Sequence, residues 1–297
     1  MPIRTCNITV DQHGQEIAEH GTSAFPIACY QDDIFINPVP WHWHEALEAI
    51  LVTEGVLLLG CGSTQYTVHA GEGFFINTGV LHGCWDYQSS CCRIRSIVFH
   101  PRLVGGTPDS IFFQKYLHPL MENRTSGSLL LSPRIPWQAE LIGHIDAAWQ
   151  SVKQESLGYE FDVWNHLSGI ILLLHNSLPA GSTDISRKSQ RDAQRIKGML
   201  QFIHAHYPEK ITVSEIAQCV SISESECLRC FRSTVQLTPN QYLRQYRVRQ
   251  AAKLLISTEE KVSSVAHACG FDDLSFFAKT FRELQGISPS QYRSQGK

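Results

Sequence analysis

The chain has 297 residues, of which 43% are hydrophobic and 18% charged, a composition that excludes a largely disordered protein. No apolar run reaches the ~18 residues of a membrane span, and the N-terminus lacks the apolar core of a signal peptide. We therefore expect a cytoplasmic protein without a membrane partner. The formal net charge is −3, yet the residues from Gln190 onward carry 15 Lys and Arg against 10 Asp and Glu. This basic excess favours nucleic acid as a partner of the C-terminal part.

Short apolar runs broken by Gly, Asn and Pro extend from about Ile27 to Phe99. Turn residues recur within this region, and the pattern predicts turns at 54–55, 60–62, 70–73 and 78–79. Short strands separated by turns every ~8–12 residues indicate an antiparallel β-barrel or jelly roll. We assign residues 1–133 to this domain.

Helical periodicity replaces the strand pattern after His100, with helices predicted over 136–153 and 157–178. Three tryptophans, Trp137, Trp149 and Trp164, together with a leucine-rich end, predict that residues 134–178 form a helical dimerisation segment. Packing within one chain is the alternative use of these apolar stripes. The polar stretch 179–190 then predicts a linker.

The last hundred residues contain an internal repeat. Residues 213–232 read VSEIAQCVSISESECLRCFR, and residues 262–282 read VSSVAHACGFDDLSFFAKTFR. Each copy has a short helix with a small residue, a turn, a capping residue and a second helix ending in Phe-Arg, which is the pattern of a helix-turn-helix. A helix predicted over 239–256 connects the two copies.

Both turns and both caps can be assigned from residue type. Gly270 suits the left-handed backbone that the second turn needs, and Ser221 lies at the same place in the first copy. Ser223 and Asp272 are the predicted N-caps of the second helices, because a short polar side chain can accept a backbone N–H there.

The second copy, together with GISPSQYR from Gly286 to Arg293, resembles the signature of AraC/XylS-family transcription regulators. The resemblance covers roughly residues 195–293, with small departures at Ser221, Gln236, Cys227 and Cys230. It implies an α+β multidomain protein whose all-α domain, residues 191–297, places two recognition helices in successive major grooves of double-stranded DNA. It also implies a small-molecule effector, a homodimer and RNA polymerase as partners.

The N-terminal half of each second helix is predicted to face base edges, because a helix entering the major groove reads bases with that end. The predicted base-facing residues are Ser225, Glu226 and Arg229 in the first copy and Leu274, Ser275 and Ala278 in the second, with Lys279 at the edge. Arg232 and Arg282 are predicted to contact phosphates. A solvated surface charge is the alternative for any single Arg or Lys.

Two motifs in the barrel region resemble those of cupins: His42-x-His44-x3-Glu48-x6-Gly55 and Gly71-x5-Asn77-x-Gly79-x2-His82. Asn77 stands where proline is usual and Asp86 where asparagine is usual. The resemblance implies a cupin-like effector-binding domain, in which His42, His44, Glu48 and His82 match the positions of metal ligands. Imidazoles with one carboxylate would suit Fe(II), Mn(II), Ni(II) or Zn(II).

Three roles remain open for these four residues: a metal site, an organic-ligand pocket without metal, and histidines with a purely structural role. We expect no cofactor and favour the organic-ligand pocket, with a divalent metal as the alternative. Aromatic residues that alternate with the histidines, Phe75 among them, and Arg95 for an anionic effector complete the predicted pocket. The predicted effector-binding residues are Trp41, His42, Trp43, His44, Glu48, Tyr66, His82, Trp85 and Arg95.

The sequence as a whole predicts a ligand-responsive transcription regulator that acts as an activator. We do not expect it to be an enzyme. The first alternative is a metal-dependent cupin enzyme or metal sensor fused to a DNA-binding module. The second is a thiol or redox sensor that uses Cys61, Cys84, Cys91 or Cys92. Ten cysteines in a cytosolic chain of this length favour free thiols over disulfides.

Overall fold

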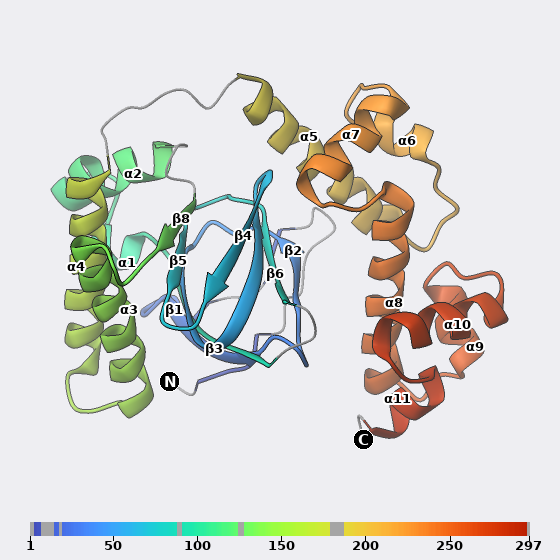
Figure 1. The fold of residues 1–297 in the computed structure, drawn as a ribbon, viewed down its shortest axis with the longest axis horizontal. Helices are drawn as coiled ribbons and strands as arrows, with labels where there is room; N and C mark the ends of the chain where they lie inside the picture. The colour runs from blue at the N-terminus through green and yellow to red at the C-terminus, as the bar shows by residue number, and fades with distance from the viewer. Residues whose placement is uncertain are drawn as a thin grey trace. The chain divides into compact units, whose positions relative to one another are not determined.

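The computed structural model describes residues 3–6, 15–17, 20–87, 91–123, 128–178 and 187–295 (Figure 1). The chain divides into two compact units, the first extending to Ala193 and the second starting at Gln194, so the boundary falls within the helix that spans Arg187–His206. Within the described ranges, no helix is both long and apolar enough to cross a membrane.

The first unit contains antiparallel β-strands, as the alternating runs predict. They are β1 (Ile27–Asp33), β2 (Val39–His42), β3 (Leu47–Cys61), β4 (Thr64–His69), β5 (Gly73–Ile76), β6 (His82–Asp86), β7 (Cys92–Phe99) and β8 (Ser128–Leu131). One layer has the order β1-β7-β3-β5-β8. The other layer is built from β2, β6, β3 and β4, so β3 belongs to both.

The long strand β3 corrects the turn predicted at 54–55. Its register against β7 shifts between Val52 and Glu54, which marks a bulge rather than a chain reversal. Gly55 follows with φ +76°, and a side chain there would collide with the backbone oxygen of Cys91. The bulge bends β3, so its first half pairs with β5 and β7 and its second half with β4 and β6.

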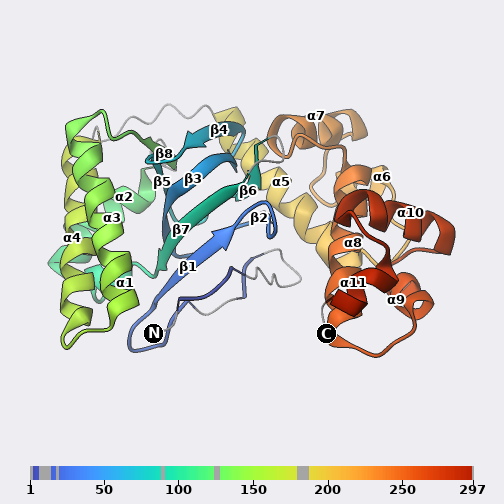
Figure 2. The same cartoon turned by 60° about the horizontal axis from the view of Figure 1, so that its bottom comes forward.

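Helices cover one face of the β1-β7-β3-β5-β8 layer (Figure 2). They are α1 (Arg102–Gly105), the π-helix η1 (Phe113–Leu117), α2 (His118–Glu122), α3 (Pro136–Gln154) and α4 (Tyr159–Ser177). The last two match the helices predicted at 136–153 and 157–178. Apolar residues of this sheet face, such as Leu47 and Ile97, form one core with Trp149 and Leu167.

The second unit is all-α and contains the repeat predicted from sequence. Its helices are α5 (Arg187–His206), α6 (Val213–Gln218), α7 (Glu224–Thr234), α8 (Pro239–Ser257), α9 (Val262–Ala268), α10 (Leu274–Gln285) and α11 (Pro289–Gln295). Because α5 starts at Arg187, the last four residues of the predicted linker are helical. The rest of that linker, 179–186, lies outside the described residues.

The turns of the repeat follow the sequence, but one cap differs. Ser221 and Gly270 both have positive φ, at 54° and 79°. Ser223 caps α7, whereas α10 is capped by Asp273, whose Oδ1 accepts the backbone N–H of Ser275 at 2.7 Å. Asp272 is therefore not the cap, because the extra residue of the second copy lies between the turn and the cap.

Candidate functional sites

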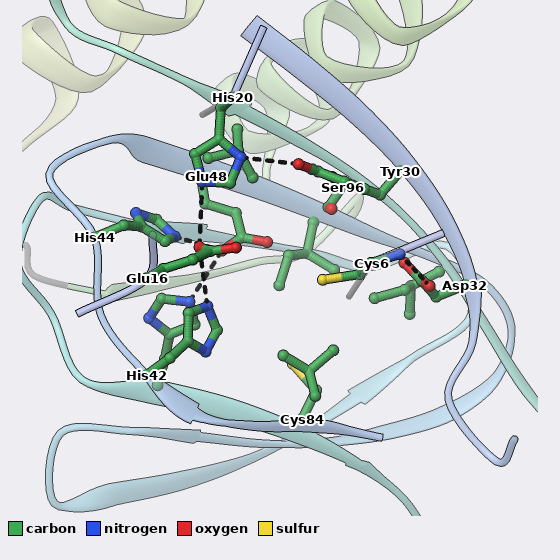
Figure 3. Close-up of a pocket in the computed structure, with 15 residues that line it drawn as sticks. Cys6, Glu16, His20, Tyr30, Asp32, His42, His44, Glu48, Cys84 and Ser96 are labelled. Carbon is green, nitrogen blue, oxygen red and sulfur yellow. Dashed lines mark hydrogen bonds and ion pairs between the residues drawn. The ribbon is translucent and has the colours of Figure 1, made fainter. Parts of the chain in front are cut away.

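A small cavity lies inside the barrel and is lined from both sheet layers (Figure 3). Its free volume is about 10 Å³, which is room for about one water molecule. The lining residues are Cys6, Glu16, His20, Tyr30, Asp32, Val39, His42, His44, Glu48, Ile50, His82, Cys84, Ile94, Ser96 and Val98.

Three histidines of the cavity are held in the same way. The Nδ1 atoms of His42, His44 and His82 lie 2.8, 3.0 and 2.8 Å from the backbone oxygens of Pro40, Ala46 and Val80. A backbone carbonyl can only accept a hydrogen bond, so each Nδ1 is the protonated nitrogen. In the neutral rings, each Nε2 then carries the lone pair.

Glu48 lies among these Nε2 atoms. Its Oε2 is 3.3 Å from Nε2 of His44 and 3.0 Å from Nε2 of His82. The second contact is close, but it is not aligned as a hydrogen bond, which leaves the buried His82 Nε2 without such a partner among the described residues. The candidate ligand atoms of His42, His44, Glu48 and His82 all lie within 4.8 Å of one another, and all four residues are buried. The structure thus brings together the full set of predicted metal ligands.

Burial and proximity shift the pKa values of this group in opposite directions. Burial, together with the neighbouring His82 and His44, holds the pKa of His42 well below its ordinary value. Burial also opposes ionisation of Glu48, but its contacts with His44 and His82 outweigh it and hold the pKa of Glu48 well below the usual range. Burial likewise opposes protonation of His44, and its contact with Glu48 overcomes this and raises the pKa of His44. Glu48 is therefore a carboxylate at neutral pH.

Five predicted effector residues do not line the cavity, and strand alternation explains why. Trp41 and Trp85 pack against each other outside it, with ring centroids 5.2 Å apart, because their neighbours His42 and Cys84 point inward. Trp43 is buried beside the inward-facing His44 but does not reach the cavity.

The remaining predicted pocket residues have other partners. Tyr66 packs on Phe74 at 4.8 Å, and Phe75 belongs to the core beneath the helices. Arg95 lies on the helix side of β7, where its guanidinium pairs with Asp146 at 2.9 Å and lies 4.5 Å from the ring centroid of Trp149. An anionic effector in the cavity therefore cannot reach Arg95 in this structure.

Sequence reasoning missed the cavity residues that lie outside the two motifs. Glu16 and His20 come from the segment before the barrel, and their contact of 3.2 Å joins Oε2 of Glu16 to Nε2 of His20. Tyr30, on β1, places its hydroxyl 2.9 Å from Nδ1 of His20. The one local signal was the four-residue spacing of Glu16 and His20, which is too common to indicate a site.

The cysteines proposed as redox sensors are mostly buried. Burial raises the pKa of Cys61 to about 12 and of Cys92 to about 11, and it raises that of Cys84 as well. Cys91 is exposed, and all ten cysteines are free thiols. The three buried thiols lack the lowered pKa of reactive cysteines.

The helix α10 presents one exposed face and one buried face. Phe277, Thr280 and Phe281 are buried against the rest of the unit. All the residues predicted to face DNA on this helix are exposed: Leu274, Ser275, Ala278, Lys279 and Arg282. Phe276, which the sequence reasoning missed, is also 47% exposed and lies 5.4 Å from the guanidinium of Arg244.

The helix α7 differs from this simple arrangement. Ser225 and Arg232 are exposed as predicted, but Glu226 and Arg229 are half-buried and pair with each other through two contacts of 2.8 Å. Arg195 of α5 also binds Glu226, at 3.0 Å. A bidentate ion pair therefore engages two of the predicted base-facing side chains. Ser225, Leu228, Arg229, Arg232 and Ser233 share one open surface of α7.

An antiparallel barrel followed by paired helix-turn-helix motifs defines a DNA-binding regulator with a sensor domain, and comparison with known proteins agrees. Residues 20–151 match the family model of the AraC-like ligand-binding domain, and residues 216–295 match that of a helix-turn-helix domain. The HTH-type transcriptional regulator YdeC of Bacillus subtilis, described as uncharacterized, is 30% identical over 97% of this chain and 98% of its own length.

Two further proteins are more distant. The HTH-type transcriptional activator RhaS of Klebsiella pneumoniae is 24% identical over 87% of this chain and 88% of its own. A crystal structure of a transcriptional regulator with an AraC-type DNA-binding domain, from Chromobacterium violaceum, covers 35% of this chain and 92% of its own at 25% identity, with a TM-score of 0.34. The present chain belongs to the AraC-type family of helix-turn-helix transcription regulators, as the sequence predicted. It is a ligand-responsive, DNA-binding regulator.

Proposed function

We propose that this regulator senses a divalent first-row transition-metal ion, held in the barrel by His42, His44, Glu48 and His82. The observation that carries the proposal is the fixed orientation of the three imidazoles, each bound through Nδ1 to a backbone carbonyl. Metal-binding histidines are oriented by this kind of second hydrogen bond. Bound there, the ion would neutralise Glu48 and link strands β2, β3 and β6.

The distances between the candidate ligand atoms support a metal ion at this site. With metal–ligand bonds of ~2.1 Å, two neighbouring ligand atoms around one ion lie roughly 3.0–3.4 Å apart. The separations from Glu48 Oε2 to the Nε2 atoms of His82 and His44 are 3.0 and 3.3 Å. Three nitrogens and one carboxylate without thiolate suit Mn(II), Fe(II), Ni(II) or Zn(II).

The size of the cavity favours an ion over the organic effector expected from the sequence. Pockets for drug-sized molecules have volumes of ~300–1,000 Å³. The free volume here is about 10 Å³, so an organic ligand would have to displace side chains that are already in contact. An ion instead occupies the space between atoms that are already in place.

At the other end of the chain, we propose that α7 and α10 enter the major groove and that Arg282 contacts a phosphate. Replacing Arg282 by alanine is expected to lower operator affinity about tenfold and to reduce the slope of log K against log salt by about one. The operator is obtained by selection from random-sequence duplex DNA with the full-length protein, and affinity is measured by fluorescence anisotropy at several salt concentrations.

The matched control is Lys210→Ala, which removes an exposed cation between α5 and α6. It is expected to leave both the affinity and the salt slope near those of the unmodified protein. If Arg282→Ala also retains both, Arg282 does not contact the phosphate backbone.

We also propose that the regulator is a homodimer and an activator that works with RNA polymerase. One of its relatives, RhaS, is named as a transcriptional activator. The dimer would form through α4, where Phe161, Trp164 and Leu172 are 80%, 39% and 48% exposed along one helical stripe.

Leu172→Glu is expected to halve the mass measured by sedimentation equilibrium, whereas Gln154→Glu, at the exposed end of α3, should not change it. A Leu172→Glu protein that remains dimeric would exclude this interface.

A further inference from the structure

We propose that Glu16, which pairs with the barrel through its backbone, is a fifth metal ligand, so that metal binding holds residues 15–17 more firmly against the barrel. The inference rests on the metal site proposed above. It assigns a second carboxylate to that site and adds a conformational consequence, because Glu16 lies outside both sheet layers.

The backbone places Glu16 beside the histidines. Its N–H donates to the backbone oxygen of Trp43 at 3.0 Å, and Gln15 forms a parallel bridge with the same residue. Trp43 lies between His42 and His44 in the chain. Pairing with Trp43 therefore fixes the segment next to the two histidines of the first motif.

The Glu16 side chain points into the cavity and is only 3% exposed. Its Oε2 lies 3.8 Å from Nε2 of His42 and 3.2 Å from Nε2 of His20, whose Nδ1 is 2.9 Å from the Tyr30 hydroxyl. Figure 3 shows the carboxylates of Glu16 and Glu48 directed into the same group of imidazoles. His20 and Tyr30 thus form an outer layer of hydrogen-bonding groups behind Glu16, and this layer orients its carboxylate toward the cavity.

The contact between Glu16 and His42 indicates a bound cation, because both facing atoms are hydrogen-bond acceptors. Since His42 Nδ1 donates to Pro40, Nε2 of the neutral ring is an acceptor. The Glu16 carboxylate is an acceptor as well, and two buried acceptors facing each other at 3.8 Å have no hydrogen atom to share. A cation bound to both resolves this, and a divalent ion also balances the two buried carboxylates of Glu16 and Glu48.

Metal titration of the full-length protein tests the inference. Zn(II) is titrated into chelator-treated protein by calorimetry, and Co(II) is used as a visible-absorption probe of the coordination sphere. Glu16→Gln keeps the size of the side chain but removes its charge. It is expected to weaken Zn(II) binding by about tenfold or more and to change the Co(II) spectrum at saturation. Glu45→Gln is the control, because Glu45 is an exposed carboxylate next to His44 in the chain that does not line the cavity, and it should match the unmodified protein.

Hydrogen exchange supplies the conformational readout. Zn(II) is expected to slow exchange at the Glu16 amide in the unmodified protein and in Glu45→Gln, but not in Glu16→Gln. An unchanged Co(II) spectrum in Glu16→Gln overturns the ligand assignment, even if affinity falls, because a purely structural role would leave the saturated coordination sphere intact. Unmodified protein that binds neither metal overturns the metal site itself, which separates the two failures.

Discussion

Replacing His82 by glutamine is expected to lower the affinity for Zn(II) by more than about 100-fold, the largest functional effect foreseen for a single side chain. Loss of an outer-layer partner of a metal ligand already costs about 10–100-fold, and His82 is itself a proposed ligand. Its Nε2 is buried, lies 3.0 Å from Glu48 Oε2 and has no hydrogen bond among the described residues. Glutamine fills a similar volume without an imidazole nitrogen.

Calorimetric titration of the full-length protein gives the affinity, and circular dichroism before titration establishes that the variant is folded. His69→Gln is the matched control, because His69 is an exposed histidine on β4 outside the cavity. It should bind Zn(II) as the unmodified protein does. A folded His82→Gln protein with undiminished affinity would rule out the four-residue site.

Replacing Trp149 by alanine is expected to cause the largest loss of stability, about 3–5 kcal/mol in the free energy of unfolding of the first unit. Trp149 is 1% exposed in the core between α3 and the sheet. Its Nε1 donates to the backbone oxygen of Tyr30 at 3.1 Å, and the Arg95 guanidinium lies over its ring. The substitution removes the packing, this hydrogen bond and the cation–π contact together.

Urea unfolding followed by circular dichroism measures the loss. Since whole domains are stable by only ~5–15 kcal/mol, the midpoint should fall sharply. The control is Phe35→Ala, which truncates a 55% exposed aromatic ring in the turn after β1 and should change the free energy by no more than ~0.5 kcal/mol. Equal midpoints for the two variants would mean that Trp149 does not anchor α3.

The parts of the site that sequence predicted well are those fixed by local spacing. His42 and His44 stand two residues apart and so share one face at the end of β2, and the second motif brings His82 onto the neighbouring strand β6. The helix-turn-helix pair was also accessible, because its turns and caps depend on residues adjacent in the chain. One inserted residue was enough to move the cap from Asp272 to Asp273.

The parts that sequence missed depend on long-range pairing or on the direction of a side chain. Glu16 reaches the cavity only because its segment pairs with Trp43. Trp85 and Arg95 were assigned to the pocket by their residue type, but each lies on the outward face of its strand. The turn predicted at Gly55 is a bulge, because a glycine with positive φ serves either feature and only the partner strands decide.

A metal-sensing regulator must bind its operator differently with and without metal. Full-length, chelator-treated protein is measured against its selected operator with and without saturating Zn(II), alongside His82→Gln. We predict that Zn(II) tightens operator binding about tenfold or more in the unmodified protein, within the usual range of coupling between two sites, and has no effect on His82→Gln. Operator affinity that stays the same while the unmodified protein binds Zn(II) would contradict a metal-sensing regulator.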